Sequence, residues 1–392
     1  MLKKNILLID SEGGHGGSSK SLLTLIKHVN KKNLHLKVLC KRVSWIKTDY
    51  KKIGIKCTVV PYLPTYTVLD SIGKNFFAII LFAFSKIIVF LVKQNTFKKY
   101  FRNFDLVHLN HSNLWFLALW IRFKFPKLKI IVHIRTMPYK NFFSKLQYKI
   151  LLKYTDKQIF ITKNEYFHFK DLAGVFPDNI IINNPVEKNK TVADKYSFLK
   201  KNKKFLIGSF SNYSYYRGTD RVFEVASYIP KKILKNIKFI IAGDINISKG
   251  AKKKLKQLKK FNNLKEYAYK SKLEDFFYFV GHINDVENIL IHIDLTLKLT
   301  REYNPWGRDI IESMLYSVPA LSIGKCDLFI KNNYSGILLQ KYDAKKVANE
   351  IIYLYKNKNI LSKLKKNSKK IVIDKCNPKI SSSRVRNVWF QL

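Results

Sequence analysis

The chain opens with an apolar run, a glycine-rich loop and a helical pattern in direct succession. Residues 5–9 (NILLI) have the length of a buried strand, residues 10–20 (DSEGGHGGSSK) form the loop, and residues 21–26 (SLLTLI) favour a helix. A strand that enters a helix through a glycine loop is typical of the first unit of a doubly wound α/β domain. The loop lacks the GxGxxG spacing, so it is only a weak indication of a dinucleotide site.

Further apolar runs of strand length follow, separated by stretches long enough for helices. They lie at residues 36–40, 106–109, 130–134 and 158–162, and a second cycle begins at 205–210 and continues at 239–244. Alternation of this kind predicts parallel sheets, and the length predicts two domains. We expect a first domain over 1–186, a polar, lysine-rich linker over 187–204 and a second domain over 205–376. Residues 377–392 are expected to form a final helix that packs back on the first domain.

Residues 304–312 (NPWGRDIIE) predict a turn that leads into an acid-bearing helix. Gly307 permits close approach to the backbone at the turn. The helix would direct free N–H groups and the positive end of its dipole at an anion. Glu312 would lie one to two turns further along. The stretch is therefore a candidate cradle for a nucleotide sugar.

Residues 279–282 (FVGH) and an apolar strand at 293–297 precede this turn, and together they resemble the donor-binding half of the family 4 glycosyltransferases. The resemblance spans roughly residues 5–365, weakly before 184 and well after it. It implies the GT-B fold, with two Rossmann-like domains facing a cleft, and transfer from a nucleotide diphosphate sugar with retention of anomeric configuration. The family has two glutamates with seven residues between them. Glu312 matches the second, whereas Asn304, whose amide can bind sugar hydroxyls, holds the first position.

Arginines near this motif are candidates to bind the departing diphosphate, which gains negative charge as the glycosidic bond breaks. Arg217 comes before Gly218 in the sequence RGTD, where the resembled family commonly has a lysine before the glycine. A guanidinium can grip phosphate oxygens in a bidentate way. Arg308 and Arg301 flank the turn, and we expect one of them to face the diphosphate or the sugar.

The resemblance assigns further donor contacts. Glu312 would accept hydrogen bonds from the ribose hydroxyls, Gly16 and Gly17 would lie near the donor phosphates, and Gly281 would mark a strand end near the base. His133 is placed like the family's histidine near the sugar, where it could bind a hydroxyl or assist the acceptor. For Gly16 and Gly17 the alternative is a merely structural tight turn. For His133 it is a histidine packed in the core. No protein nucleophile is evident, so the resemblance implies front-face transfer.

The charge of the chain is strongly positive. Lys and Arg number 73 against 27 Asp and Glu, which gives a net charge of +46. Such a field favours nucleic acid, anionic lipid or phosphorylated substrates. No zinc-finger, RNP or recognition-helix signature accompanies the dispersed lysines, so membrane and anionic donor are favoured over nucleic acid. The four cysteines include no CxxC pair and no histidine has partners at metal-ligand spacing, so we expect reduced thiols, no metal and no cofactor.

A membrane-facing segment is predicted at residues 72–93. Its core, residues 76–92, reads FFAIILFAFSKIIVFLV, with a single charge at Lys86. A spanning helix needs ~20 apolar residues, and a central lysine costs roughly 2.5–3.5 kcal/mol. Spanning would also separate neighbouring strands of one sheet. A buried core helix and an interfacial helix remain, and the flanking lysines and aromatics suit the second.

These observations predict a retaining hexosyltransferase of bacterial surface-polysaccharide or lipopolysaccharide biosynthesis. We expect it to be cytoplasmic and peripheral on the inner face of the membrane, with a nucleotide sugar as donor and a glycan or lipid-linked acceptor. One alternative, favoured by Asn304, is a GT-B protein that binds nucleotide sugars without catalysis. Another, favoured by charge alone, is a basic protein that binds nucleic acid or anionic surfaces.

Overall fold

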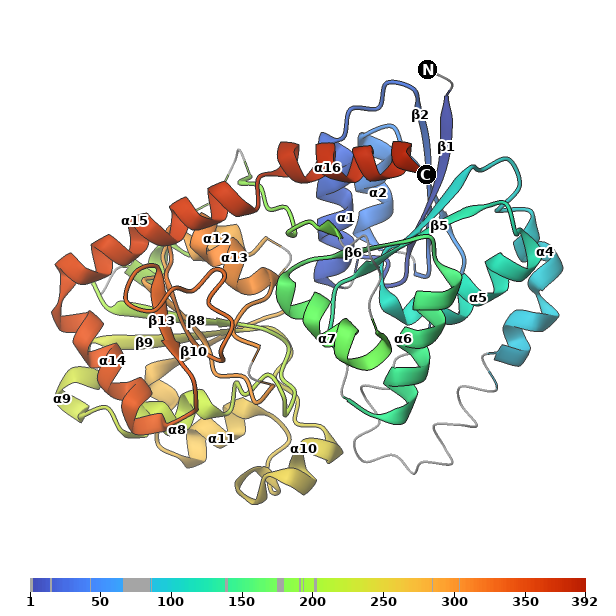
Figure 1. Cartoon of the computed structure of the whole chain (residues 1–392). Coiled ribbons are helices and arrows are strands. Elements are labelled where there is room, and N and C mark those ends of the chain that lie inside the picture. Colours follow the sequence, from blue (N-terminus) through green and yellow to red (C-terminus); the bar gives the residue numbers. More distant parts are fainter. Residues whose placement is uncertain are drawn as a thin grey trace. The chain divides into compact units, whose positions relative to one another are not determined.

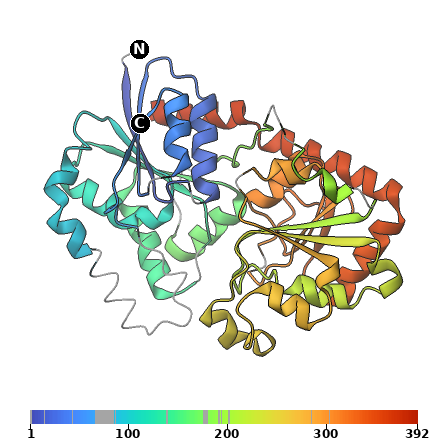
Figure 2. The same ribbon diagram turned by 180° about the vertical axis from the view of Figure 1, so that it is seen from behind.

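The chain divides into two compact units (Figures 1 and 2). Unit 1 comprises Met1–Pro185 and Cys376–Leu392, and unit 2 comprises Val186–Lys375. The computed structural model describes residues 3–14, 16–42, 44–65, 85, 87–137, 140–174, 180–189, 192, 194–200, 203–283, 285–302 and 304–392.

Unit 1 is built on a parallel sheet of seven strands in the order β3-β2-β1-β4-β5-β6-β7. The strands are β1 (Lys4–Asp10), β2 (Leu34–Cys40), β3 (Lys56–Val59), β4 (Leu106–Leu109), β5 (Lys129–Ile134), β6 (Lys157–Phe160) and β7 (Ile180–Ile181). The order reverses beside β1, as in a doubly wound sheet. The parallel sheet predicted from the alternating pattern is confirmed.

Helices cover both faces of this sheet. They are α1 (Gly17–His28), α2 (Trp45–Lys52), α4 (Gln94–Lys98), α5 (Trp115–Lys124), α6 (Phe142–Tyr154), α7 (Lys163–Ala173) and α16 (Pro378–Gln391). Ile6 and Leu8 of β1 are buried in one core with side chains of α1, α2 and α16, whereas Leu7 and Ile9 are buried in another with α5, α6 and α7. Successive strand residues point to opposite faces, so the apolar run of β1 serves both cores.

The end of the chain is part of unit 1. Helix α16 contacts α1, and its Val385, Val388 and Trp389 are buried in the same core as Ile6 and Leu8. The indole Nε1 of Trp389 donates to Nδ1 of His108 at 3.0 Å. A buried indole N–H requires such a partner, so this contact fixes the helix on the sheet.

Unit 2 repeats the architecture with six parallel strands in the order β10-β9-β8-β11-β12-β13. The strands are β8 (Phe205–Phe210), β9 (Ile237–Ala242), β10 (Phe277–Gly281), β11 (Leu295–Lys298), β12 (Ala320–Ile323) and β13 (Gly336–Leu339). The helices are α8 (Arg221–Ser227), α9 (Lys231–Leu234), α10 (Lys249–Lys254), α11 (Leu264–Lys270), α12 (Glu287–Leu290), α13 (Arg308–Leu315), α14 (Ala344–Lys356) and α15 (Lys358–Lys375). Figures 1 and 2 place α12 and α13 on the opposite face of the sheet from α8 and α11.

The region predicted to be a linker, residues 187–204, lies within unit 2. Tyr196 and Leu199 are buried in one core with Leu206 of β8 and Ile240 of β9. These two apolar side chains are enough to anchor the stretch. The prediction of a linker was based on its polar, lysine-rich composition, in which two apolar residues carry little weight. Its described part therefore packs with the second unit.

Most of the segment predicted to face the membrane lies outside the described residues, which resume at 85 and 87. Residues 87–92 are helical. Phe90 is fully buried and its ring contacts those of Phe97 and Trp120, whereas Val89 and Val92 are 49% and 78% exposed. In the part of the chain that the structure describes, no helix has the length and apolar composition needed to cross a bilayer.

Candidate functional site

The loop after β8 and the end of β11 meet closely in unit 2. Gly218 has φ +70°, and a Cβ at this position would lie 2.1 Å from the carbonyl oxygen of Leu299. The backbone of Tyr216 accepts hydrogen bonds from the Thr300 hydroxyl at 3.0 Å and from the Arg301 amide at 2.8 Å. Only glycine fits this contact, which holds residues 216–218 against the segment that leads to the predicted turn.

Arg217 is presented by this loop. Its side chain is exposed, and no described residue accepts a hydrogen bond from its guanidinium. Burial lowers the pKa of Lys298 at the end of β11, and the charge of Arg217 lowers it further, so the two cations lie near one another. Arg217 is therefore a cation that is open to a ligand beside the β11 end.

Arg301 is held differently. Its Nη1 and Nη2 both donate to the carboxylate of Asp220, Nη1 at 2.8 Å, and Nη1 also donates to the Tyr215 carbonyl at 2.7 Å. The guanidinium lies 4.7 Å from the Tyr215 ring centroid. In this structure the fork geometry of Arg301 is directed at Asp220, which makes the residue a brace between two loops.

Helix α13 begins directly after Gly307, as the sequence predicted. Gly307 is the N-cap residue and, having no side chain, it leaves the first turn without a side-chain cap. Behind the turn, the Ser322 hydroxyl lies 2.7 Å from the Pro305 carbonyl oxygen, and the buried Trp306 ring packs on Phe329. These contacts hold the turn in place, and the first backbone N–H groups of α13 have no side-chain cap, as at helix ends that bind anions.

Glu312 lies one turn along α13 and is 17% exposed. Its Oε1 accepts a hydrogen bond from Nε of Arg308 at 2.7 Å. The residues are four apart on one helix face, where such pairs form. The structure therefore brings two of the predicted site residues into direct contact.

Asn304 lies just before the turn. Its Oδ1 is buried and has no hydrogen-bond partner in the described part of the chain. Buried amide oxygens are almost always paired, so this one calls for a donor that the described residues do not supply. A sugar hydroxyl or a water molecule would serve.

Glycines end the strands β9 and β10 in left-handed conformations. Gly243 has φ +120°, and its Cβ would overlap the backbone of Ser211, 2.6 Å away. Gly281 has φ +78° and open space around it, and its carbonyl accepts from the Gly243 amide at 2.7 Å. The two strand ends are thereby tied together at the carboxyl edge of the sheet, where doubly wound domains bind ligands.

The glycines in the glycine loop of unit 1 differ in backbone conformation. Gly13 and Gly14 have φ +59° and +93°, whereas Gly16 is extended and is the N-cap residue of α1, which Gly17 begins. A Cβ on Gly16 would overlap the Glu12 carboxylate. The tight turn therefore depends on Gly13 and Gly14, and the two predicted donor contacts lie at the amino end of α1.

His133 lies inside β5 and is 1% exposed. Its ring stacks on that of His108 with centroids 5.6 Å apart, and Nδ1 lies 3.2 Å from Nη2 of Arg135. Burial, with the nearby Arg135 charge, holds the pKa of His133 well below its ordinary value. The imidazole is enclosed, and Arg135, two residues further along, lies just past the end of β5.

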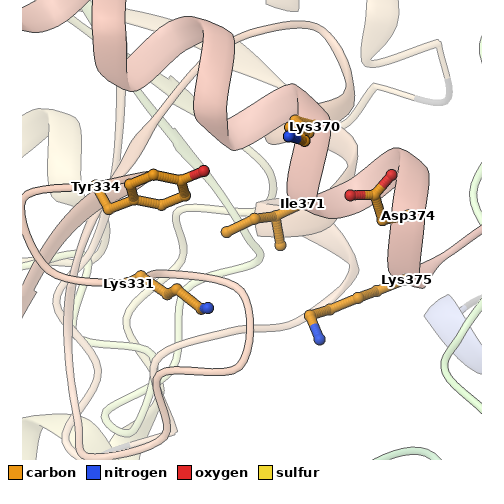
Figure 3. Close-up of a pocket in the computed structure, with 6 residues that line it drawn as sticks. All are labelled: Lys331, Tyr334, Lys370, Ile371, Asp374 and Lys375. Carbon is orange, nitrogen blue, oxygen red and sulfur yellow. The ribbon is translucent and has the colours of Figure 1, made fainter.

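Two further features of unit 2 were not predicted from the sequence. One is an ion pair between Lys298 and Asp309, for which the only signal is a lysine at the end of an apolar strand. The other is a cavity of about 380 Å³ lined by Lys331, Tyr334, Lys370, Ile371, Asp374 and Lys375 (Figure 3). None of the predicted site residues lines this cavity. Across the described residues, no three His, Cys, Asp or Glu side chains are grouped to hold a metal ion.

Two doubly wound parallel-sheet units, one of which presents an arginine loop and a glycine-capped, acid-bearing helix at its sheet edge, place the chain among the Rossmann-like α/β proteins. Residues 192–371 match the family model for glycosyl transferases group 1. Unit 2 therefore contains a domain similar to that family over most of its length. No curated protein matches the chain.

Solved structures match nearly the whole chain. Anabaena Alr3699/HepE in complex with UDP and glucose has 16% identity and a TM-score of 0.77, with 99% of this chain and 100% of that chain covered. Sucrose-phosphate synthase from Thermosynechococcus elongatus has 14% identity and a TM-score of 0.76, with 99% and 98% covered. WaaG, a glycosyltransferase involved in lipopolysaccharide biosynthesis, has 13% identity and a TM-score of 0.67, with 98% and 99% covered. The predicted GT-B fold is confirmed.

Proposed function

We propose that the protein is a retaining hexosyltransferase that uses a nucleotide diphosphate sugar. The observation that carries the proposal is the arrangement in unit 2, where Gly307 opens α13, Glu312 lies one turn along it, and Gly218 holds the Arg217 loop against the same region. An open helix end and an unpaired arginine are both complementary to a diphosphate. The family match of residues 192–371 supports the same reading.

Each group has a role in this proposal. Glu312 accepts hydrogen bonds from the ribose hydroxyls, and Asn304 binds a hydroxyl of the transferred sugar. Arg217, together with the first turn of α13 and Arg308, stabilises the charge that develops on the leaving diphosphate. Gly281 shapes the strand edge near the base. The reaction so described needs no cofactor besides its donor substrate, because the arginine side chains supply the positive charge that a metal ion would otherwise supply.

A thermal-shift panel tests the proposal. We expect one of UDP, ADP, GDP or their sugars to raise the midpoint of thermal unfolding, since a ligand that binds only the folded state stabilises it by RT ln(1 + [L]/Kd). UDP and UDP-glucose come first, because they are the ligands named with the similar Alr3699/HepE structures. No shift with any of them would contradict the proposal. Binding without transfer to any acceptor would instead identify a non-catalytic protein, the reading favoured by Asn304.

We further propose a glycan or lipid-linked acceptor and a peripheral position on an anionic membrane, in polysaccharide or lipopolysaccharide biosynthesis. Four apolar side chains of residues 87–92 support this, namely Ile88, Val89, Leu91 and Val92, which are 42–78% exposed. They lie beside lysines on a chain of net charge +46. Apolar side chains among lysines are suited to anionic lipid surfaces, and WaaG gives the pathway a precedent among similar folds.

Vesicle sedimentation checks the membrane proposal. The protein should sediment with vesicles of phosphatidylglycerol and phosphatidylcholine, and less so as salt is raised. The double substitution Val89→Glu and Val92→Glu should release most of it, since it places two acids against an anionic, apolar surface. Tyr353→Glu, at an exposed tyrosine of α14 in unit 2, is the matched control and should have little effect. Equal sedimentation of all three proteins would contradict the assignment.

A further inference from the structure

A buried ion pair lies under the predicted donor turn. Lys298, the last residue of β11, has a side chain that is 7% exposed, and its Nζ lies 3.0 and 2.8 Å from the two carboxylate oxygens of Asp309. Asp309 is the second residue of α13. Burial lowers the pKa of the Lys298 ammonium, and the Asp309 carboxylate opposes that shift. Lysines are almost never buried without such a partner.

The pair occupies the space that a side chain on Gly307 would need. A Cβ at residue 307 would lie 2.6 Å from Oδ1 of Asp309 and 3.0 Å from Nζ of Lys298. On the other side, the Ser322 hydroxyl lies within hydrogen-bond distance of the carbonyls of Lys298, at 3.0 Å, and Pro305, at 2.7 Å. The strand end, the turn and the first turn of α13 are thus held together through this ion pair.

The pair also belongs to the charged surroundings of Arg217. The charge of Arg217 lowers the pKa of Lys298, and that of Glu302 raises it. Asp309 therefore offsets one of two neighbouring cations, while Arg217 remains open to a ligand. Replacing a buried ion pair by apolar residues of similar volume is often neutral for stability or stabilising. Stability alone does not explain why the pair is placed at this turn.

We propose that Lys298 and Asp309 are positioning residues for the nucleotide sugar. Their ion pair sets the Gly307 turn and the start of α13, so that Arg308 and Glu312 are presented to the diphosphate and the ribose. The inference rests on the proposed function, since it concerns the same donor site. It gives a role to Asp309, which lies within residues 304–312, and to Lys298 on the preceding strand, two residues to which the sequence motif assigned none.

The test compares nucleotide affinity with stability. In the double variant Lys298→Met and Asp309→Leu the pair is neutral and the volume is nearly kept, so we expect an unfolding midpoint close to that of the unaltered protein. Titration calorimetry with UDP, ADP and GDP should nevertheless show the best-bound nucleotide weakened about tenfold or more, because small displacements of positioning groups are costly. Lys365→Met, which removes a lysine paired with Asp294, is the matched control and should bind normally.

Asp309→Asn keeps the size of the side chain and is the variant to measure if the double variant fails to fold. It too should bind the nucleotide more weakly than the unaltered protein. A double variant that folds and binds with unaltered affinity would overturn the inference alone. If the unaltered protein binds none of the three nucleotides, the proposed function fails and the inference falls with it. The two failures are therefore distinguishable.

Discussion

Glu312→Ala is expected to abolish the thermal stabilisation of the protein by its nucleotide. In the proposed site the carboxylate accepts hydrogen bonds from ribose hydroxyls, and a hydrogen bond to a charged group contributes about 1.5–3 kcal/mol, or roughly 10- to 150-fold in affinity. The side chain is only 17% exposed, so water does not readily replace it. The substitution also removes the acceptor of the Arg308 Nε hydrogen bond.

Two further variants separate these effects. Glu312→Gln keeps an acceptor for Arg308 and should retain part of the nucleotide shift, because the amide is neutral but of similar size. Glu350→Ala removes a glutamate from α14 and serves as the matched control, with an unaltered shift expected. A Glu312→Ala protein that folds and is stabilised as strongly as the unaltered one would place the ribose elsewhere.

Arg217→Ala is expected to lower turnover far more than donor affinity. The guanidinium is exposed and no described residue accepts a hydrogen bond from it, so it is available to the diphosphate. Negative charge on the leaving oxygens is greater in the transition state than in the bound donor, and a group that binds this charge acts mainly on kcat. Loss of one such group in other enzymes costs about 10²–10³ in kcat, which sets the expected scale here.

Initial rates with the nucleotide sugar found in the thermal-shift panel provide the measurement. Arg217→Lys should recover part of the rate, because a lysine keeps the charge but loses bidentate geometry. Arg384→Ala, which removes an exposed arginine from α16, should leave the rate unchanged. An equal loss of affinity and turnover in Arg217→Ala would assign the residue to ground-state binding instead.

The fold could be predicted because its signals are local. Each core strand is a short apolar run, and the parallel arrangement follows from the regular spacing of those runs. Gly307 and Glu312 could be recognised for the same reason, since the turn and the helix are contiguous in the sequence. The burial of Tyr196 and Leu199 could not, because their partners Leu206 and Ile240 lie on strands that only the folded sheet brings to them.

Contacts between distant segments account for most of what the sequence did not reveal in the site. The pairing of Arg301 with Asp220 depends on the approach of two loops at Gly218, and the pairing of Lys298 with Asp309 depends on the direction in which β11 and α13 run. A lysine at a strand end and an acid in a first helical turn are each unremarkable in sequence. Their burial against each other is a property of the tertiary structure alone.

The position of α16 has a consequence for biosynthesis. Because Val385, Val388 and Trp389 fill the same core as Ile6 and Leu8, one face of the first sheet is incomplete until these late residues have been translated. Unit 2 lies between the two parts of unit 1 in the chain. It can therefore fold on the ribosome as a continuous segment before the last part of unit 1 has been synthesised. The core of the unit that is translated first is therefore the one whose last side chains are synthesised after the whole of unit 2.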